Sequence, residues 1–275
     1  MGNPYLIEGA IAVVTGAAQG LGLSITEQLA RNGATVVMAD LQARKVEVEA
    51  GNLKQKGLEV FSSYLDVGDS TVVNKFFDKI ADEYGRLDIL VNNAGVGQKV
   101  TPIVQLDDTE WDRVIRTTLG GTFYCCRAAG SIMERQESGK IVNISSINGQ
   151  NPAALVAAYN VAKEGVISLT RTLALELAAY GVTVNAVCPG PVYTEFNQSS
   201  MAQRCKTLGL TEAQMIERIR DAIPLGRWGE PKDIAHSVAF LCSPAAGWIT
   251  GEVLRVSGGL EGVTAAPPSR SKPNE

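Results

Sequence analysis

Three polar residues are spaced in a way that could carry a proton transfer. Tyr159 and Lys163 lie four residues apart, and Ser146 precedes Tyr159 by thirteen. On a helix, positions four apart project from the same face, so the ammonium group can lie beside the phenol. A nearby cation favours the phenolate and lowers the pKa of a tyrosine from its reference of about 10. Ser146 could hold the substrate oxygen that exchanges the proton, although Ser145 competes for that role.

A glycine-rich turn precedes this trio. The apolar run 10–14 leads into T-G-A-A-Q-G-L-G at 15–22, and a helical pattern follows until Gly33. Strand, turn and helix in this order are typical of a dinucleotide site, because glycines let the backbone approach a pyrophosphate and the helix N-terminus offers unpaired N–H groups. The spacing is G-x-x-x-G-x-G, which taken alone is also compatible with an ordinary turn.

Asp40 follows the second apolar run, 34–39, about twenty residues beyond the turn. A carboxylate at this point can accept hydrogen bonds from the adenosine ribose hydroxyls, and it repels a 2′-phosphate. The turn holds no Arg or Lys, since Gln19 precedes Gly20, and Leu41 directly follows Asp40. Both absences favour NAD over NADP. The alternative is that Asp40 is a polar strand end or a helix cap.

Taken together, the motifs resemble the short-chain dehydrogenase/reductase family over about residues 6–259. Asp66-Val67 resembles the pair that contacts the adenine ring, and 92–95 resembles the turn that braces the sheet after the fourth strand. The segment 189–194 resembles the one that holds the nicotinamide carboxamide. The cofactor-binding residues that this implies are Gly16, Gln19, Gly20, Leu21, Gly22, Asp40, Leu41, Asp66, Val67, Asn93, Ala94, Gly95, Tyr159, Lys163, Pro189, Gly190, Val192 and Thr194.

The pattern of apolar segments predicts one doubly wound α/β Rossmann domain, with a seven-stranded parallel sheet flanked by helices on both faces. We expect strands near 10–15, 34–39, 58–65, 87–92, 139–145, 182–188 and 252–257. Helices are expected near 20–32, 43–56, 69–84, 107–136, 155–180, 211–222 and 231–242. The domain would span 1–264, with a substrate loop or lid at about 193–223, and 265–275 would form a flexible tail.

The resemblance implies an NAD-dependent interconversion of a secondary alcohol and a ketone. Tyr159 would be the general acid and base, Ser146 would donate a hydrogen bond to the reacting oxygen, and Lys163 would lower the pKa of Tyr159. Thr118 stands where the family usually has an asparagine, the fourth member of the catalytic group. A threonine has one donor where an amide has two. The alternative function is therefore a catalytically impaired sensor or scaffold that binds the dinucleotide.

The substrate pocket is expected at the carboxyl ends of the strands, with contacts from Gln98, Asn148, Gln150 and Tyr193. Within the lid, Thr211 is expected to cap a helix, and Leu210 and Ile219 are expected to serve in ordinary packing. Basic residues do not cluster here in the sequence, which favours a neutral, fairly apolar small molecule. A diol or a sugar alcohol stays open as an alternative.

Bulk composition mostly excludes classes of function. The net charge is −4 and basic residues are scattered, so no nucleic-acid partner is expected. The absence of a long apolar stretch or a signal peptide predicts a cytoplasmic protein with no membrane partner. Five cysteines without ligand spacing and a single histidine predict no metal site. The segment 154–178 is apolar on several stripes, so one face would meet another subunit together with 107–136, and the resemblance implies a homotetramer.

Overall fold

The computed structural model of the chain describes residues 5–262, except for the side chains at 196, 199, 200, 203, 204, 207 and 208. Within this part, seven strands form one parallel sheet in the order β3-β2-β1-β4-β5-β6-β7. The predicted Rossmann fold is thereby confirmed. The strands are β1 (Ile11–Thr15), β2 (Thr35–Asp40), β3 (Val60–Tyr64), β4 (Ile89–Asn92), β5 (Gly139–Ile144), β6 (Val182–Pro189) and β7 (Val253–Val256).

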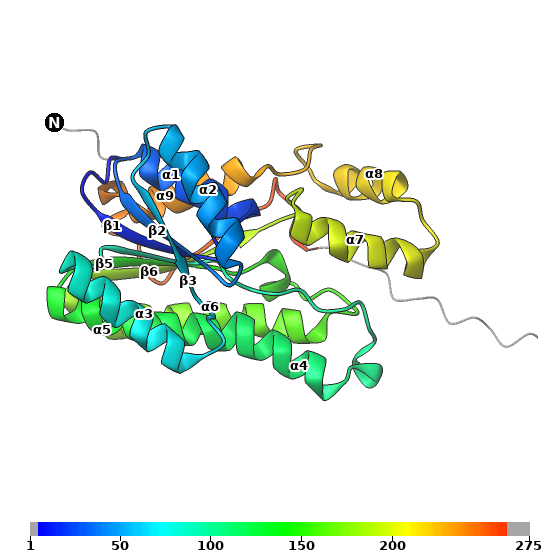
Figure 1. Cartoon of the computed structure of the whole chain (residues 1–275). Helices are drawn as coiled ribbons and strands as arrows, with labels where there is room; N and C mark the ends of the chain where they lie inside the picture. Colours follow the sequence, from blue (N-terminus) through cyan, green and yellow to red (C-terminus); the bar gives the residue numbers. More distant parts are fainter. Residues whose placement is uncertain (1–4, 263–275) are drawn as a thin grey trace, which may run out of the picture.

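Helices cover both faces of the sheet, as Figure 1 shows. One face carries α1 (Gly20–Arg31), α2 (Ala43–Gln55) and α9 (Pro231–Cys242), and the other carries α3 (Ser70–Tyr84), α5 (Gly121–Gln136) and α6 (Ala157–Leu177). Each face has its own cluster of buried apolar residues. The central strands are buried along nearly their whole length because helices exclude water from both of their sides.

The sheet reverses its winding between β1 and β4, which pair in parallel with Val14 opposite Val91. Connections leave these two strands in opposite directions, so a crevice opens beyond their carboxyl ends. Asn93 joins the two strand ends, since its Nδ2 donates to the carbonyl oxygens of Thr15 at 3.0 Å and of Gly16 at 2.9 Å. This bracing was predicted for the 92–95 turn.

The helix predicted over 107–136 is interrupted. It consists of α4 (Asp108–Val114), a π-helical segment Ile115–Gly120, and α5. A π segment arises when a helix accommodates an additional residue, and such segments are frequent at functional sites. This one contains Thr118, whose side chain is fully buried. The sequence pattern predicted one continuous helix here and did not reveal this segment.

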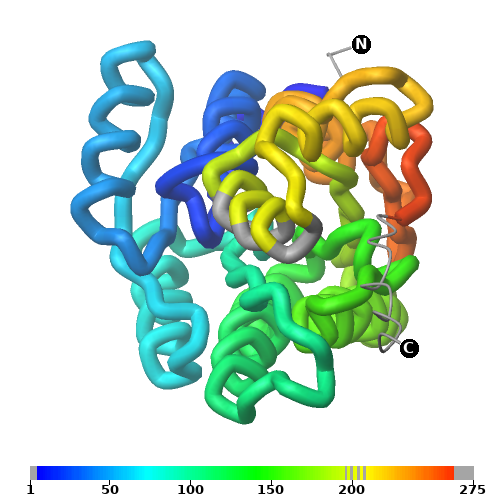
Figure 2. Tube along the Cα trace, turned by 90° about the vertical axis from the view of Figure 1, so that its right-hand side faces the viewer, coloured from blue at the N-terminus to red at the C-terminus, as the bar shows by residue number. Residues whose placement is uncertain are grey.

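The lid contains a helix that the sequence pattern did not predict, α7 (Glu195–Leu208), followed by α8 (Glu212–Ala222). Helix α7 has a mostly polar sequence with no continuous apolar stripe, which removes the usual signal. Helix α8 begins at a capping box in which Thr211 and Gln214 bond each other's backbone N–H groups, so the predicted cap is confirmed. Both helices lie across the edge where the strands end (Figures 1 and 2).

Short helical turns occupy Ile103–Gln105, Ile147–Gly149, Ala178–Tyr180 and Pro244–Ala246. The predicted tail at 265–275 lies outside the described residues. Within 5–262, none of the helices has both the length and the apolar character needed to cross a bilayer.

Candidate active site

The glycine turn is shaped by two close approaches. Gly16 has a φ of 64°, and a Cβ there would lie 2.8 Å from the Cα of Ala94. A Cβ on Gly22 would lie 2.1 Å from the carbonyl oxygen of Gly16 and 2.6 Å from Nδ2 of Asn93. A side chain at Gly16 would push the turn away from the loop after β4, and one at Gly22 would push α1 away from the turn. With glycine in both places the turn keeps both contacts, and backbone N–H groups stay free to approach a pyrophosphate.

A cleft of about 1390 Å³ opens beside this turn. The residues that line it include every predicted cofactor-binding residue except Gly22, which packs behind the turn. The cradle of Gly16, and a cleft that runs from Asp40 past the glycine turn to Tyr159, fit a dinucleotide. The predicted residues that line it are Gly16, Gln19, Gly20, Leu21, Asp40, Leu41, Asp66, Val67, Asn93, Ala94, Gly95, Tyr159, Lys163, Pro189, Gly190, Val192 and Thr194. Sequence reasoning missed Gln42, Leu65, Val96, Thr117, Glu195 and Asn197 as lining residues.

Asp40 both lines the cleft and braces the turn. Its Oδ2 accepts from the backbone N–H of Ala18 at 3.0 Å, and its Oδ1 accepts from that of Gln42 at 2.9 Å. The residue is only 7% exposed. The bracing role that the sequence left open is thus observed, and ribose binding stays a prediction that these bonds do not preclude, because one carboxylate can accept several hydrogen bonds.

A cation that the sequence analysis missed lies near the adenosine end of the cleft. Lys45 bonds the side chain of Gln19 and forms an ion pair with Oε2 of Glu195 at 3.2 Å. The sequence analysis considered only the turn and the residue directly after Asp40. Lys45 lies in the first turn of α2, and only folding brings it beside Gln19.

Tyr159 and Lys163 share one face of α6, as the four-residue spacing predicted. The Nζ atom of Lys163 lies 5.8 Å from the centroid of the Tyr159 ring. It donates to the carbonyl oxygen of Ile144 at 2.6 Å, and Oγ of Ser145 donates to the carbonyl oxygen of Lys163 at 2.7 Å. The end of β5 therefore fixes Lys163 at both its backbone and its ammonium group.

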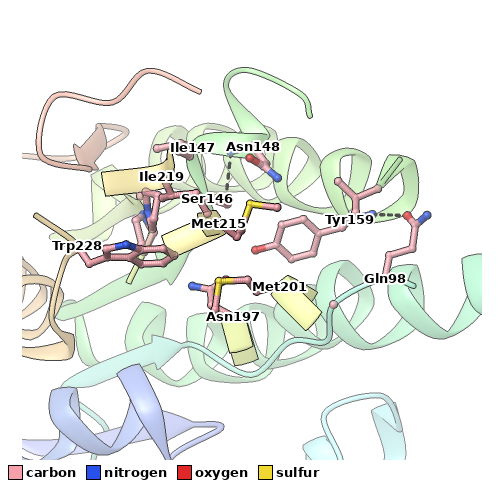
Figure 3. A pocket seen from close by; sticks show the side chains of 15 residues that line it. Gln98, Ser146, Ile147, Asn148, Tyr159, Asn197, Met201, Met215, Ile219 and Trp228 are labelled. Atoms are coloured by element: carbon pink, nitrogen blue, oxygen red, sulfur yellow. Dashed lines mark hydrogen bonds between the residues drawn. The ribbon is translucent and has the colours of Figure 1, made fainter. Parts of the chain in front are cut away.

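A second cavity, of about 760 Å³, adjoins the cleft. Ser146 and Tyr159 line both spaces. Oγ of Ser146 accepts from the backbone N–H of Asn148 at 3.1 Å, and Figure 3 shows the Tyr159 hydroxyl directed into the cavity. Ser145, in contrast, uses its hydroxyl on Lys163. This geometry favours Ser146 over Ser145 for the role at the reacting oxygen, which stays a prediction.

The predicted substrate contacts divide into two pairs. Gln98 and Asn148 line the second cavity, whereas Gln150 and Tyr193 are absent from its lining residues. Gln150 is exposed beyond the turn 147–149, and the Tyr193 ring packs edge-on against Trp228 at 5.8 Å. The lining of this cavity therefore gives no support to the prediction that these two residues contact substrate. The residues that instead complete its apolar wall are Ile147, Val156, Pro191, Met201, Met215, Ile219 and Trp228.

Leu210 and Ile219 were expected to serve in ordinary packing. This holds for Leu210 and only partly for Ile219. Both pack in the lid cluster around Met201, Cys205 and Met215, but Ile219 also lines the cavity. Nε1 of Trp228 donates to the carbonyl oxygen of Ile216 at 3.1 Å, which fixes the indole against the lid. Helices α7 and α8 thus supply part of the hydrophobic wall of the cavity through Met201, Met215 and Ile219.

Residues 16–261 match the family model described as enoyl-(acyl carrier protein) reductase. The chain belongs to the short-chain dehydrogenase/reductase family. It is 39% identical over 252 residues to 3-oxoacyl-(acyl-carrier-protein) reductase FabG of Staphylococcus aureus, covering 90% of this chain and 97% of that protein. It is 38% identical over 250 residues to the uncharacterized oxidoreductase YxjF of Bacillus subtilis (strain 168), with coverages of 90% and 97%.

Solved structures agree with this family assignment. A variant of actinorhodin polyketide ketoreductase with NADPH superposes with a TM-score of 0.89 at 32% identity, covering 93% of this chain and 98% of that one. Levodione reductase gives a TM-score of 0.88 at 30% identity, with coverages of 92% and 98%. Short-chain dehydrogenase/reductases bind a nicotinamide dinucleotide and interconvert CH–OH and carbonyl groups. The chain is therefore an oxidoreductase of this kind.

Thr118 is the departure from the usual family pattern. Its Oγ1 accepts from the backbone N–H of Val96 at 3.1 Å and donates to the carbonyl oxygen of the same residue at 3.4 Å. A Cβ on Gly95 would lie 3.4 Å from this hydroxyl and 3.7 Å from Nζ of Lys163, so Thr118 and Lys163 flank the same glycine. The single donor of Thr118 is used on the backbone, and the residue braces the loop beside Lys163.

Burial lowers the pKa of Lys163 to about 8, because removing the ammonium group from water disfavours its charged form. An unfolded lysine titrates near 10.5. Below pH 8 the group is charged in both states, and folding carries the full desolvation cost. As the pH rises from 8 to 10.5, the folded state loses its proton first and the cost disappears.

We expect Lys163→Met to reveal this cost as a pH-dependent difference in stability. Measured by urea unfolding without dinucleotide, wild type should gain about 3 kcal/mol relative to the variant between pH 8 and 10.5. The lost hydrogen bond to Ile144 adds an offset that does not vary with pH. Because the Cys188 thiol interacts with the Lys163 charge, both proteins carry Cys188→Ala, and the other buried thiols then titrate equally in the two. A difference in unfolding free energy that stays flat across this range would contradict the pKa assigned to Lys163.

The cysteines are structural. All five are buried and unpaired thiols, and burial raises the pKa of Cys126 and of Cys242 to about 12. A thiol that stays protonated is neither a nucleophile nor a good metal ligand. Among residues 5–262, His, Cys, Asp and Glu side chains form no group of three that could hold a metal ion.

Proposed function

We propose that the chain is an NAD(H)-dependent oxidoreductase that interconverts a secondary alcohol and a ketone, with Tyr159 as general acid and base. One observation carries the proposal. The cleft beside the glycine turn and the second cavity meet at Ser146 and Tyr159, with Lys163 beside the Tyr159 ring. A substrate carbon in the second cavity would thus lie between the cofactor and the phenol.

Tyr159, Lys163 and Ser146 each have a separate role in the proton transfer. When bound, the dinucleotide supplies or accepts the hydride. Tyr159 as phenolate takes the hydroxyl proton of an alcohol, and as phenol it protonates the oxygen of a ketone. The Lys163 ammonium stabilises the phenolate, and Ser146 donates to the reacting oxygen as negative charge develops on it. Asn148 holds Ser146 in place through its backbone N–H.

The lining of the second cavity supports a neutral, fairly apolar small molecule as substrate. None of the fifteen lining residues among those that the structure describes is Asp, Glu, Lys or Arg. Two methionines and Trp228 provide apolar surface, while Asn148 and Asn197 offer neutral polar groups. A carboxylate or phosphate placed here would lose its hydration without gaining a counter-charge from these residues. The amides leave a second hydroxyl on the substrate as an option.

Turnover of secondary alcohols with NAD tests this function. We expect NADH absorbance to appear with a panel of neutral secondary alcohols, and to disappear with the matching ketones in the reverse direction. The alternative is a sensor or scaffold that binds the dinucleotide without turnover. The observation in its favour is that Thr118 uses its only donor on the carbonyl oxygen of Val96. Tight NADH binding together with no turnover across the whole panel would favour that alternative.

NAD is proposed over NADP because of the charge of Asp40. We expect Asp40→Asn to shift the ratio of kcat/KM for NAD over NADP toward NADP by about 10–100-fold, since the repulsion of a 2′-phosphate is removed. The amide oxygen still accepts from one of the two backbone N–H groups, which limits the damage to the turn. Replacing Glu47, a carboxylate on α2 that does not line the cleft, by Gln is the control. An unchanged ratio in Asp40→Asn would show that the ribose is read by other groups.

Homotetramer formation is also proposed. Phe123, Val161 and Leu175 on α5 and α6 are exposed by 41%, 45% and 83%. Apolar side chains gathered on two helices are typical of surfaces that meet another subunit. Sedimentation equilibrium should give a mass four times that of the chain, and charged substitutions at Val161 and Leu175 should lower it.

A further inference from the structure

Gln98 caps the helix that carries Tyr159. Its Oε1 accepts from the backbone N–H of Ala158 at 2.7 Å and from that of Tyr159 at 3.4 Å. The N-cap position of α6 is Val156, which has no side-chain hydrogen bond to offer. Unpaired N–H groups in a first helical turn need an acceptor. Gln98 supplies it from a loop about sixty residues earlier in the chain, and the side chain is almost fully buried.

The same loop holds the segment that enters α6. Leu155 has a φ of 70°, a left-handed conformation that costs a non-glycine residue on the order of 1 kcal/mol or more. Its carbonyl oxygen accepts from the backbone N–H of Thr101 at 2.9 Å and from Nε2 of Gln98 at 3.4 Å. The entry into α6 is therefore kept in a strained geometry by bonds from residues 98–101, rather than by its own local preferences.

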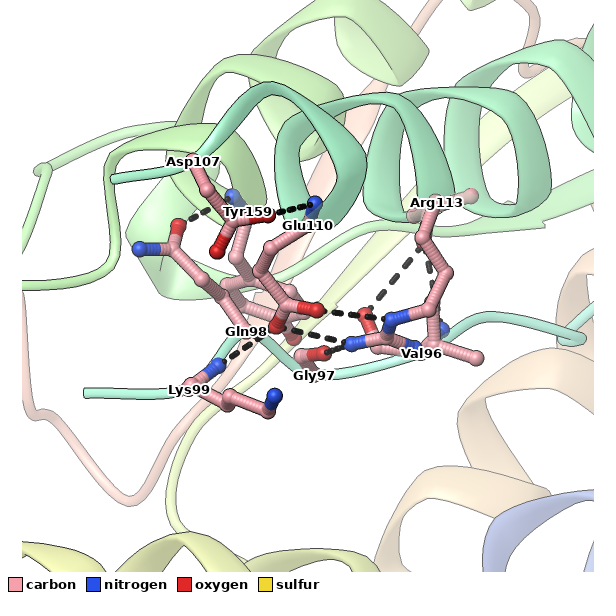
Figure 4. A network of polar contacts seen from close by, with 9 residues as sticks. Val96, Gly97, Gln98, Lys99, Asp107, Glu110, Arg113 and Tyr159 are labelled. Atoms are coloured by element: carbon pink, nitrogen blue, oxygen red, sulfur yellow. Dashed lines mark hydrogen bonds and ion pairs between the residues drawn. The ribbon is translucent and has the colours of Figure 1, made fainter. Parts of the chain in front are cut away.

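Helix α4 in turn fixes this loop, as Figure 4 shows. Oε1 of Glu110 accepts from the backbone N–H of Lys99 at 2.8 Å, and Nη2 of Arg113 donates to the carbonyl oxygen of Gly97 at 2.7 Å. Glu110 and Arg113 also pair with each other at 2.8 Å. Glu110 is 5% exposed, and its bond to Arg113 lowers the pKa of its carboxyl. The two charged side chains thus bond the loop backbone at Gly97 and Lys99, the residues on either side of Gln98.

We propose that Gln98 is a positioning residue for Tyr159: it sets the first turn of α6, and the Glu110–Arg113 pair holds it in register. The sequence analysis expected Gln98 to contact substrate, but its amide oxygen is used by the helix. The phenol oxygen lies far from the Tyr159 backbone, so a small rotation of the first turn moves it considerably. A displacement near 1 Å can cost about 100-fold in rate. This inference rests on the proposed function.

The test first removes the side-chain amide of Gln98 and then, in a second variant, restores a hydrogen-bond acceptor at the same position. We expect Gln98→Met, of similar size but without the acceptor, to lower kcat about 10–100-fold with KM and NADH affinity changed by less than about threefold. Gln98→Glu should recover most of kcat, because a carboxylate oxygen accepts from the same N–H groups. Amide hydrogen exchange at residues 157–161 should be faster in Gln98→Met and close to wild type in Gln98→Glu.

A matched control exists on α5. Oε1 of Gln136 accepts from the backbone N–H of Leu87, and its Nε2 donates to the carbonyl oxygen of the same residue, each at 2.8 Å. Gln136→Met removes a similar amide far from the two cavities, so it should lower stability and leave kcat unchanged. Arg113→Met loosens the loop with Gln98 intact. Arg113→Met should also lower kcat. The double variant of Gln98→Met and Arg113→Met should have a kcat little below that of Gln98→Met alone, because both changes act on the same loop.

The outcomes separate the two proposals. Full kcat in Gln98→Met, or no recovery in Gln98→Glu, overturns the positioning role while the proposed function stands. A lack of turnover in wild type refutes the proposed function and this inference together. If Gln98→Met does not fold, Arg113→Met and Gln98→Glu decide the matter. Wild-type kcat in Arg113→Met would then show that the loop does not position Tyr159.

Discussion

Tyr159→Phe is expected to lower kcat by about 10²–10⁴-fold, the range that general acid–base catalysis contributes. The change removes one hydroxyl and keeps the ring that lies 5.8 Å from Lys163. The proton then has no acceptor between the substrate oxygen and the lysine. Binding of NADH, followed by its fluorescence, should change by less than about threefold, because the remaining residues that line the cleft are untouched.

Tyr180→Phe is the control for this variant. Tyr180 lies in the short turn after α6, at the end opposite Tyr159, so removal of its hydroxyl should leave kcat at the wild-type value. Should Tyr159→Phe retain more than about a tenth of wild-type kcat, Tyr159 would not be the acid–base group. A large loss of NADH binding in the same variant would instead point to a cofactor-binding role for the hydroxyl.

Gly22→Ala is expected to abolish measurable dinucleotide binding and to destabilise the fold by about 3 kcal/mol, the upper end of the cost of overpacking. The added methyl group would lie 2.1 Å from the carbonyl oxygen of Gly16 and 2.6 Å from Nδ2 of Asn93. Helix α1 must then move away from the turn, and the two bonds that Asn93 makes to the end of β1 are strained or broken. Isothermal titration with NADH and urea unfolding measure the two effects.

Gly51→Ala offers the same chemical change in a helix where nothing obstructs it. A Cβ at Gly51 in α2 meets no atom within 4 Å. Because alanine is the better helix former, this variant should gain about 0.5–1 kcal/mol and bind NADH as wild type does. NADH affinity near wild type in Gly22→Ala would contradict the view that contact between α1 and the turn forms the phosphate site.

The sequence by itself determined the sheet, its order of elements and the spacing of the catalytic trio. Local signals suffice for these features, since buried parallel strands are read as apolar runs and a four-residue spacing on a helix brings two side chains together. The glycines of 15–22 are equally local, because each serves a backbone geometry that few other residues permit.

The tertiary structure alone decided which side chains meet across long stretches of chain. Lys45 reaches Gln19, Gln98 caps α6 at Tyr159, and Ile219 and Trp228 form a cavity wall. It also excluded Tyr193 and Gln150 from the cavity and placed a π segment at Thr118. None of these has a periodic signature, because each depends on how loops and helices pack after the sheet has formed. Periodicity reports which face of an element is buried, while the partner of that face is set by the packing of the whole chain.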